Sequence, residues 1–171
     1  RKSDNGNNSN DNVSASIIRG TIDNENPKLT TMWVSMGNPA STIFTPVFPI
    51  GYPPQELRGN ILIGNSDDYS TSPICDLSNI IKNRLYSYPE ISNDGISQDK
   101  YIDSFQLDDG NNGGIWNNYI KDSEDNIYNF TSNILNTIQS DVNLEFNLNS
   151  LQNFTAAFAF SNLNNIETSK P

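Results

Sequence analysis

The sequence contains no histidine and only one cysteine, Cys75. The lack of histidine excludes Ser-His-Asp and Cys-His catalysis within this chain, and it also excludes zinc sites built on imidazole. A single cysteine can form neither an internal disulfide nor a thiolate metal cluster. No loop has the acidic spacing of a helix–loop–helix calcium site, and the nearest group, Asp103, Asp108 and Asp109, is more typical of a solvated turn. We therefore expect no metal and no cofactor.

Basic residues are also scarce, because 10 Lys and Arg stand against 20 Asp and Glu and give a net charge of -10. A surface this negative repels phosphate groups, so the sequence predicts neither nucleic acid nor anionic membranes as partners. No apolar run is long enough to span a membrane, and no signal peptide is present. Because the chain begins at Arg1, we expect a processed product of a secreted or cell-envelope protein.

The length of 171 residues suits one domain with a sizeable core. Residues 1–12 are polar and rich in Asn, Ser and Gly, which predicts a flexible N-terminal segment. We expect the ordered domain to cover residues 13–165 and a short tail to follow at 166–171.

The first half of the chain has the pattern of strands. Residues 13–19 alternate and predict a strand with Val13, Ala15 and Ile17 on one face. Residues 29–36 and 41–48 predict two more strands. The Gly-Asn-Pro turn between these last two favours antiparallel pairing, and Pro46 favours an edge position for the third strand because proline lacks an amide hydrogen.

The second half has helical spacing. Apolar residues recur every three or four positions over 74–86, 115–138 and 146–163, and each range predicts an amphipathic helix. Residues 101–107 alternate like a short strand or a connecting segment. Strands followed by helices indicate an α+β fold with helices on one face of an antiparallel sheet.

The segment 13–50 carries the most distinctive motifs. It contains V-S-A-x-x-I-x-G at Val13, L-T-T-M-W-x-x-x-G-N-P at Leu29, and a strand that ends in P-V-F; S-P-I-C-D-L and Y-I-D follow later in the chain. These motifs resemble the distal part of the N-terminal-nucleophile (Ntn) hydrolases. More narrowly, they are similar to the acyl-CoA:6-aminopenicillanic acid acyltransferase type, also called C45 peptidase-like.

The resemblance implies a four-layer αββα sandwich with two stacked antiparallel sheets. It also implies a cysteine nucleophile at an N-terminus exposed by self-cleavage, whose own α-amino group is the base. The enzyme would hydrolyse a linear amide C–N bond or transfer an acyl group. This chain does not begin with Cys, Ser or Thr. We therefore expect it to be the C-terminal part, whose partners are the nucleophile-bearing segment of the same precursor and a small amide substrate, and we expect Cys75 to be structural.

Four residues are candidates for the site. The resemblance suggests that Arg19 lowers the pKa of the thiol, although an exposed strand-end role fits equally. Ser14 and Ser16 alternate with the apolar face, so they face either a pocket between sheets or solvent. Asn38 could present its amide to an oxyanion or simply serve the Gly-Asn-Pro turn.

Two other interpretations remain open from the sequence. The chain could be a non-catalytic secreted or cell-envelope binding module, or a family member that keeps the scaffold and has lost catalysis. Three strands supply only one layer of sheet, so an apolar face would be left uncovered. We therefore expect a second polypeptide or a homo-oligomer to cover that face.

Overall fold

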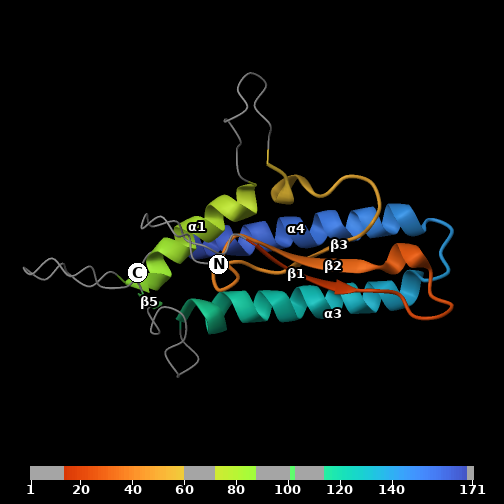
Figure 1. Ribbon diagram of the computed structural model, residues 1–171, viewed down its shortest axis with the longest axis horizontal. Helices are drawn as coiled ribbons and strands as arrows, with labels where there is room; N and C mark the ends of the chain where they lie inside the picture. Colours follow the sequence, from red (N-terminus) through yellow and green to blue (C-terminus); the bar gives the residue numbers. More distant parts are fainter. Residues whose placement is uncertain (1–13, 60–71, 88–100, 103–113, 169–171) are drawn as a thin grey trace, which may run out of the picture.

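The computed structural model describes residues 14–59, 72–87, 101–102 and 114–168, which together have mixed α+β architecture (Figure 1). In these ranges, a three-stranded antiparallel sheet lies against long helices, and a separate two-stranded pair joins β4 (Tyr86–Ser87) to β5 (Tyr101–Ile102). The α+β class predicted from the sequence is confirmed. The expected flexible segment 1–12 and the acidic group at 103–109 lie outside the described residues.

The sheet has the strand order β1 (Ser14–Arg19), β2 (Thr31–Met36) and β3 (Thr45–Val47). Both pairings are antiparallel, and Pro46 lies opposite Trp33 in an edge strand, as predicted. The third strand is shorter than the expected range 41–48. Its first residues form a turn instead, because Thr42 Oγ1 donates to Met36 O and Ser41 Oγ donates to Ser78 O.

The helices match the predicted ranges closely. Helix α1 covers Pro73–Leu85, and α3 covers Lys121–Ile138 after a π-helical turn, η3, at Trp116–Ile120. Helix α4 covers Leu144–Thr168 and is longer at both ends than predicted. It runs three residues into the segment expected to be a tail, where Ile166 is almost fully buried in the core.

Helix α4 is the centre of the packing. It contacts α1, α3, β3, η3 and the short 3-10 helix η2 (Gln55–Leu57). The larger hydrophobic cluster joins these elements and consists of Ile43, Leu57, Ile74, Leu77, Ile81, Ile115, Ile120, Ile127, Ala156, Ala159, Leu163 and Ile166. A smaller cluster lies at the other end of α3 and α4 and includes Leu29 and Phe48, which anchor the loops before β2 and after β3.

Gln152 fixes the extended chain after β3 onto α4. Its side chain is fully buried, its Oε1 accepts a hydrogen bond from Phe48 N at 3.2 Å, and its Nε2 donates to Tyr52 O at 3.1 Å. A buried amide that bonds backbone groups on a proline-rich loop replaces the strand partners that the loop lacks.

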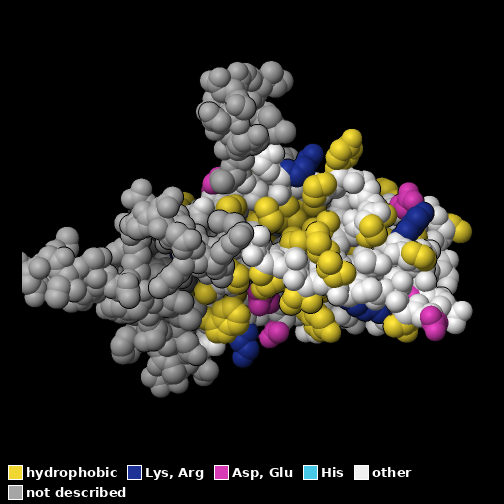
Figure 2. All heavy atoms as spheres, in the orientation of Figure 1, with side chains coloured by type: hydrophobic (Ala, Val, Ile, Leu, Met, Phe, Trp, Pro, Cys, Tyr) yellow, Lys and Arg dark blue, Asp and Glu magenta, His cyan; other side chains and the backbone are white. Residues whose placement is uncertain are grey.

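Side chains on both sides of β1 are exposed, and only Ala15 is half-buried. Ile17 is 62% exposed and Ile18 is 67% exposed, while Val13 lies outside the described residues. These side chains are exposed because β1 forms the edge of the sheet and packs mainly against β2. Figure 2 shows apolar side chains gathered on the face that carries the sheet.

Candidate functional site

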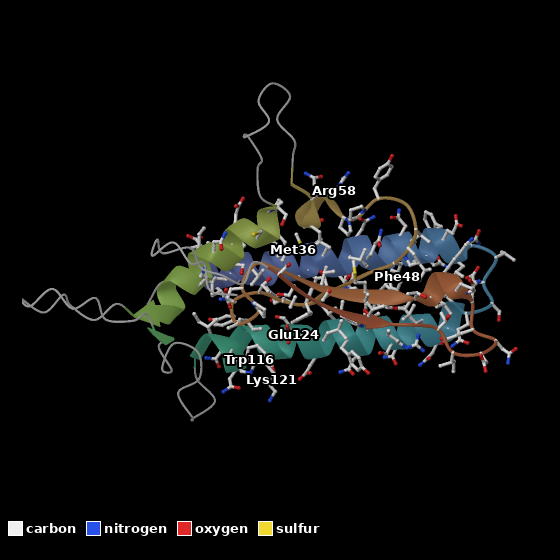
Figure 3. The ribbon with its side chains drawn as sticks, in the orientation of Figure 1. Met36, Phe48, Arg58, Trp116, Lys121 and Glu124 are labelled. Carbon is white, nitrogen blue, oxygen red and sulfur yellow. The ribbon has the colours of Figure 1, made fainter. Side chains whose placement is uncertain are left out.

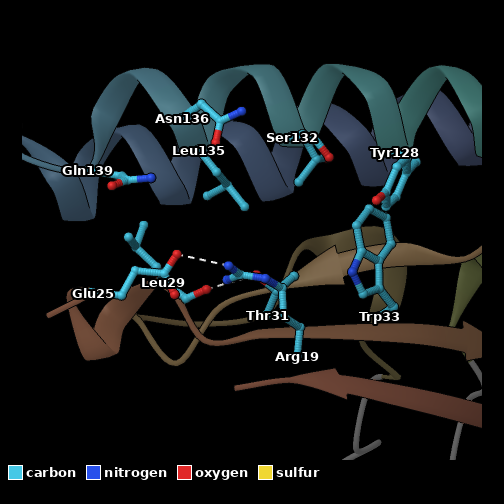
Figure 4. A pocket seen from close by; sticks show the side chains of 11 residues that line it. Arg19, Glu25, Leu29, Thr31, Trp33, Tyr128, Ser132, Leu135, Asn136 and Gln139 are labelled. Carbon is cyan, nitrogen blue, oxygen red and sulfur yellow. Dashed lines mark hydrogen bonds and ion pairs between the residues drawn. The ribbon is translucent and has the colours of Figure 1, made fainter. Parts of the chain in front are cut away.

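A cleft of about 120 Å³ lies between the sheet and helix α3 (Figure 4). Charged, polar and apolar side chains meet there, from β1, β2, their connection and α3. The lining residues are Arg19, Glu25, Leu29, Thr31, Trp33, Tyr128, Thr131, Ser132, Leu135, Asn136 and Gln139.

Arg19 reaches this cleft from the end of β1. Its guanidinium donates to Glu25 Oε1 at 2.8 Å, and the other Glu25 oxygen accepts from Ile22 N at 3.1 Å. The hydrogen bond from Arg19 and the one from Ile22 N hold the pKa of Glu25 below its ordinary value. The charge of Arg19 is therefore balanced within the β1–β2 connection, which does not favour a role in activating a distant thiol.

Trp33 and Tyr128 bound the cleft at one end, with ring centroids 5.8 Å apart. Deeper in, Thr31 Oγ1 donates to Leu29 O at 2.9 Å, whereas the buried Thr131 Oγ1 has no hydrogen-bond partner in the described part of the chain. A buried hydroxyl without a partner costs free energy in the folded chain.

Ser14 and Ser16 lie on the other face of the sheet. Ser14 pairs with Met36 and Ser16 with Val34, whereas Arg19 pairs with Thr31. Because side chains alternate along a strand, both serines point away from the cleft. Ser14 is also about 17 Å from Arg19 along the strand. The structure thus does not bring these candidates together with Arg19.

Asn38 serves the turn after β2. Its Oδ1 accepts from Ala40 N at 2.9 Å, and its carbonyl oxygen accepts from Ser41 N at 2.9 Å. The preceding Gly37 has a φ of 102°, which other residues rarely adopt. This geometry matches the turn role that the sequence also allowed.

Cys75 lies half-buried in the first turn of α1. Burial raises the pKa of its thiol, and the nearby Asp76 carboxylate raises it further. Its Sγ is 3.9 Å from the Asn79 amide nitrogen. A raised pKa lowers the thiolate population, so the local environment favours a structural thiol over a nucleophile.

Glu124 is a notable residue that the sequence interpretation missed. It projects from α3, and its Oε1 accepts from Phe44 N at 3.1 Å (Figure 3). Burial raises the pKa of its carboxyl group, and Asp125 adds to the effect. The helical spacing could have revealed Glu124, because it lies on the same stripe of α3 as Ile120 and Ile127, and both of these are buried.

In the parts of the chain that the structure describes, no group of three or more acidic or cysteine side chains is arranged to hold a metal ion. No described helix has the length and apolar character needed to cross a membrane. Comparison with known proteins gives no match to a family model, to a curated protein or to a solved structure.

Proposed function

We propose that this chain is the non-nucleophile, C-terminal part of a cysteine Ntn hydrolase that hydrolyses a linear amide or transfers an acyl group. The observation that carries the proposal is the open state of β1. Its outer edge has no strand partner among the described residues, and Ile18 of β1 and its cross-strand partner Met32 of β2 are both exposed. Exposed edges and apolar sheet faces are normally covered in folded proteins.

A nucleophile-bearing segment would cover this surface with a second sheet of a four-layer sandwich. Its N-terminal cysteine would pass the thiol proton to its own α-amino group, and the thiolate would attack the amide carbonyl. The amine would leave with that proton, and water or an acyl acceptor would then cleave the thioester. Ser14 and Ser16 are the residues of this chain best placed to face the substrate there, since both are exposed on the outward face of β1.

The test combines this chain with the segment encoded immediately upstream of Arg1 in the parent gene. We expect the two to co-purify and to hydrolyse a chromogenic acyl anilide, and neither should do so alone. Replacing the first cysteine of the upstream segment by alanine should abolish hydrolysis and leave the complex intact. A gene that starts just before Arg1, or a complex without any amidase or acyltransferase activity, would contradict the proposal.

Two substitutions locate the interface. Ile18→Lys should prevent association, because it places a charge in the apolar contact, whereas Ile22→Lys should not. Both side chains are exposed, but Ile22 follows β1 in the loop. Equal loss of association in the two variants would show that added charge, not the face of β1, is responsible.

The cleft beside α3 favours a second candidate function, binding of a small polar molecule without catalysis. Thr131 Oγ1 is the specific observation, because it is a buried hydroxyl that lines the cleft and has no partner among the described residues. A screen of small polar compounds by thermal shift would test it. A genuine ligand should lose its stabilising effect in Thr131→Val.

A further inference from the structure

Two hollows lie along the groove between α3 and α4, on the side of the helix pair that the sheet does not cover. Each has a volume of about 320 Å³, and neither is lined by any residue of the sheet. Ile134, Ile138 and Leu151 line the first, and Ile127 and Phe158 line the second. These hollows are distinct from the cleft at Arg19, which opens on the other side of α3.

A ridge of two aromatic rings separates the hollows. Phe130 on α3 and Phe154 on α4 have ring centroids 5.0 Å apart, and both residues line both hollows. Phe154 is 55% exposed although it also contacts Phe158, with centroids 6.4 Å apart. The surface therefore presents a protruding aromatic pair with a depression on either side.

The exposed side of α4 is mostly polar, and Phe146 and Phe154 are the large apolar side chains on it. Leu148 and Leu151 are buried in the smaller core cluster, while Phe154 and Phe146 are exposed on other faces. Phe154 thus places a large, exposed apolar ring in the groove between α3 and α4.

We propose that a second copy of this chain occupies the groove, with the Phe130–Phe154 ridge of each copy in a hollow of the other. A two-fold interface requires one surface to carry both the protrusion and its complement, and this surface does. None of the residues that line the hollows is charged, so two chains of net charge -10 can meet here without opposing carboxylates.

The dimensions of the helix pair give an estimate of the interface area. A face about 27 Å long and 20 Å wide gives roughly 500 Å² per copy and 1,000 Å² in total, near the lower limit for a specific interface. We therefore expect a weak, reversible dimer. This proposal does not depend on the proposed function, because β1 and the helix groove are different surfaces.

The experiment is sedimentation equilibrium of the 171-residue chain over micromolar to submillimolar concentrations. The wild-type chain should show a monomer–dimer equilibrium, and Phe154→Asp should weaken it at least tenfold. The matched control is Phe146→Asp, which adds the same charge at a position on α4 that is 73% exposed and outside both hollows. It should leave the dissociation constant within about twofold, as surface positions outside an interface do.

Other outcomes overturn the proposal. A wild-type chain that is folded and monomeric throughout the range excludes the dimer. If Ile18→Asp dissociates the dimer and Phe154→Asp does not, the dimer forms through the edge of β1 and not through the helix groove. Far-UV circular dichroism of each variant separates loss of the interface from loss of the fold, and Phe130→Asp gives an independent second test of the ridge.

Discussion

Gly37 and Ser78 approach so closely that a Cβ atom at position 37 would lie 2.3 Å from Ser78 Oγ. This contact joins the end of β2 to helix α1, and Gly37 also has a positive φ of 102°. Both features require the absence of a side chain at this position.

The first prediction is that Gly37→Ala destabilises the fold by about 2–4 kcal/mol, through backbone strain together with overpacking against α1. Chemical denaturation would measure this loss of unfolding free energy. Gly51→Ala is the control for strain alone, because Gly51 has a φ of 55° with nothing within 4 Å of a Cβ. It should cost about 1 kcal/mol. Equal losses in the two variants would show that the contact with Ser78 contributes nothing.

The second prediction concerns the buried amide of Gln152. Gln152→Met keeps a similar volume but leaves Phe48 N and Tyr52 O without their side-chain partner, which should cost about 2–4 kcal/mol of unfolding free energy. Asn149→Ala removes only the hydrogen bond from Gln152 Nε2 to an exposed side chain and should cost less than about 0.5 kcal/mol. Similar values for both variants would refute the anchoring role.

The third prediction is a pH dependence at the Arg19–Glu25 pair. The pKa of Glu25 is lowered in the folded chain, so the pair stabilises the fold above the pKa of the unfolded carboxyl group, and this stabilisation disappears as pH falls through the folded-state pKa. Arg19→Gln should therefore raise the pKa of Glu25 and lower stability near neutral pH, with no difference from wild type in strong acid. Carboxyl NMR titration would measure the pKa. The control is Lys28→Gln, which breaks the separate Lys28–Glu145 pair and should leave the pKa of Glu25 unchanged.

The fourth prediction is low reactivity of Cys75. Because burial raises the pKa of its thiol, the folded chain should react with iodoacetamide near neutral pH more slowly than the urea-unfolded chain does. Cys75→Ala should lower stability by about 1 kcal/mol and leave any activity of the complete assembly intact. Faster alkylation in the folded state would instead indicate an activated thiol.

Much of the fold follows from periodicity. The turn at Gly37–Pro39 and the lack of an amide hydrogen in Pro46 correctly predicted the antiparallel pairing and the edge position of β3. The ends of the elements were less predictable, because tertiary contacts decide them. Side-chain bonds of Thr42 shorten β3, and burial of Ile166 prolongs α4.

The candidate site was less accessible to sequence reasoning. The alternation of β1 places Ser14 and Ser16 on the opposite face from Arg19, but it cannot show which face a neighbouring helix covers. The partner of Arg19, Glu25, lies in a turn without periodicity, so only the folded loop reveals the ion pair. Glu124 and Thr131 belong to a helix face whose burial depends on long-range packing.

The central position of α4 has a consequence for synthesis of the chain. The helix that contacts α1, α3 and β3 comprises residues 144–168, so the ribosome makes it after every element that it covers. During translation, β1–β3 and α1 emerge without the helix that closes their core. Apolar side chains such as Ile43 and Ile74 remain in water until α4 has left the exit tunnel. Nascent chains of this protein should therefore be clients of ribosome-associated chaperones until α4 is free to pack against them.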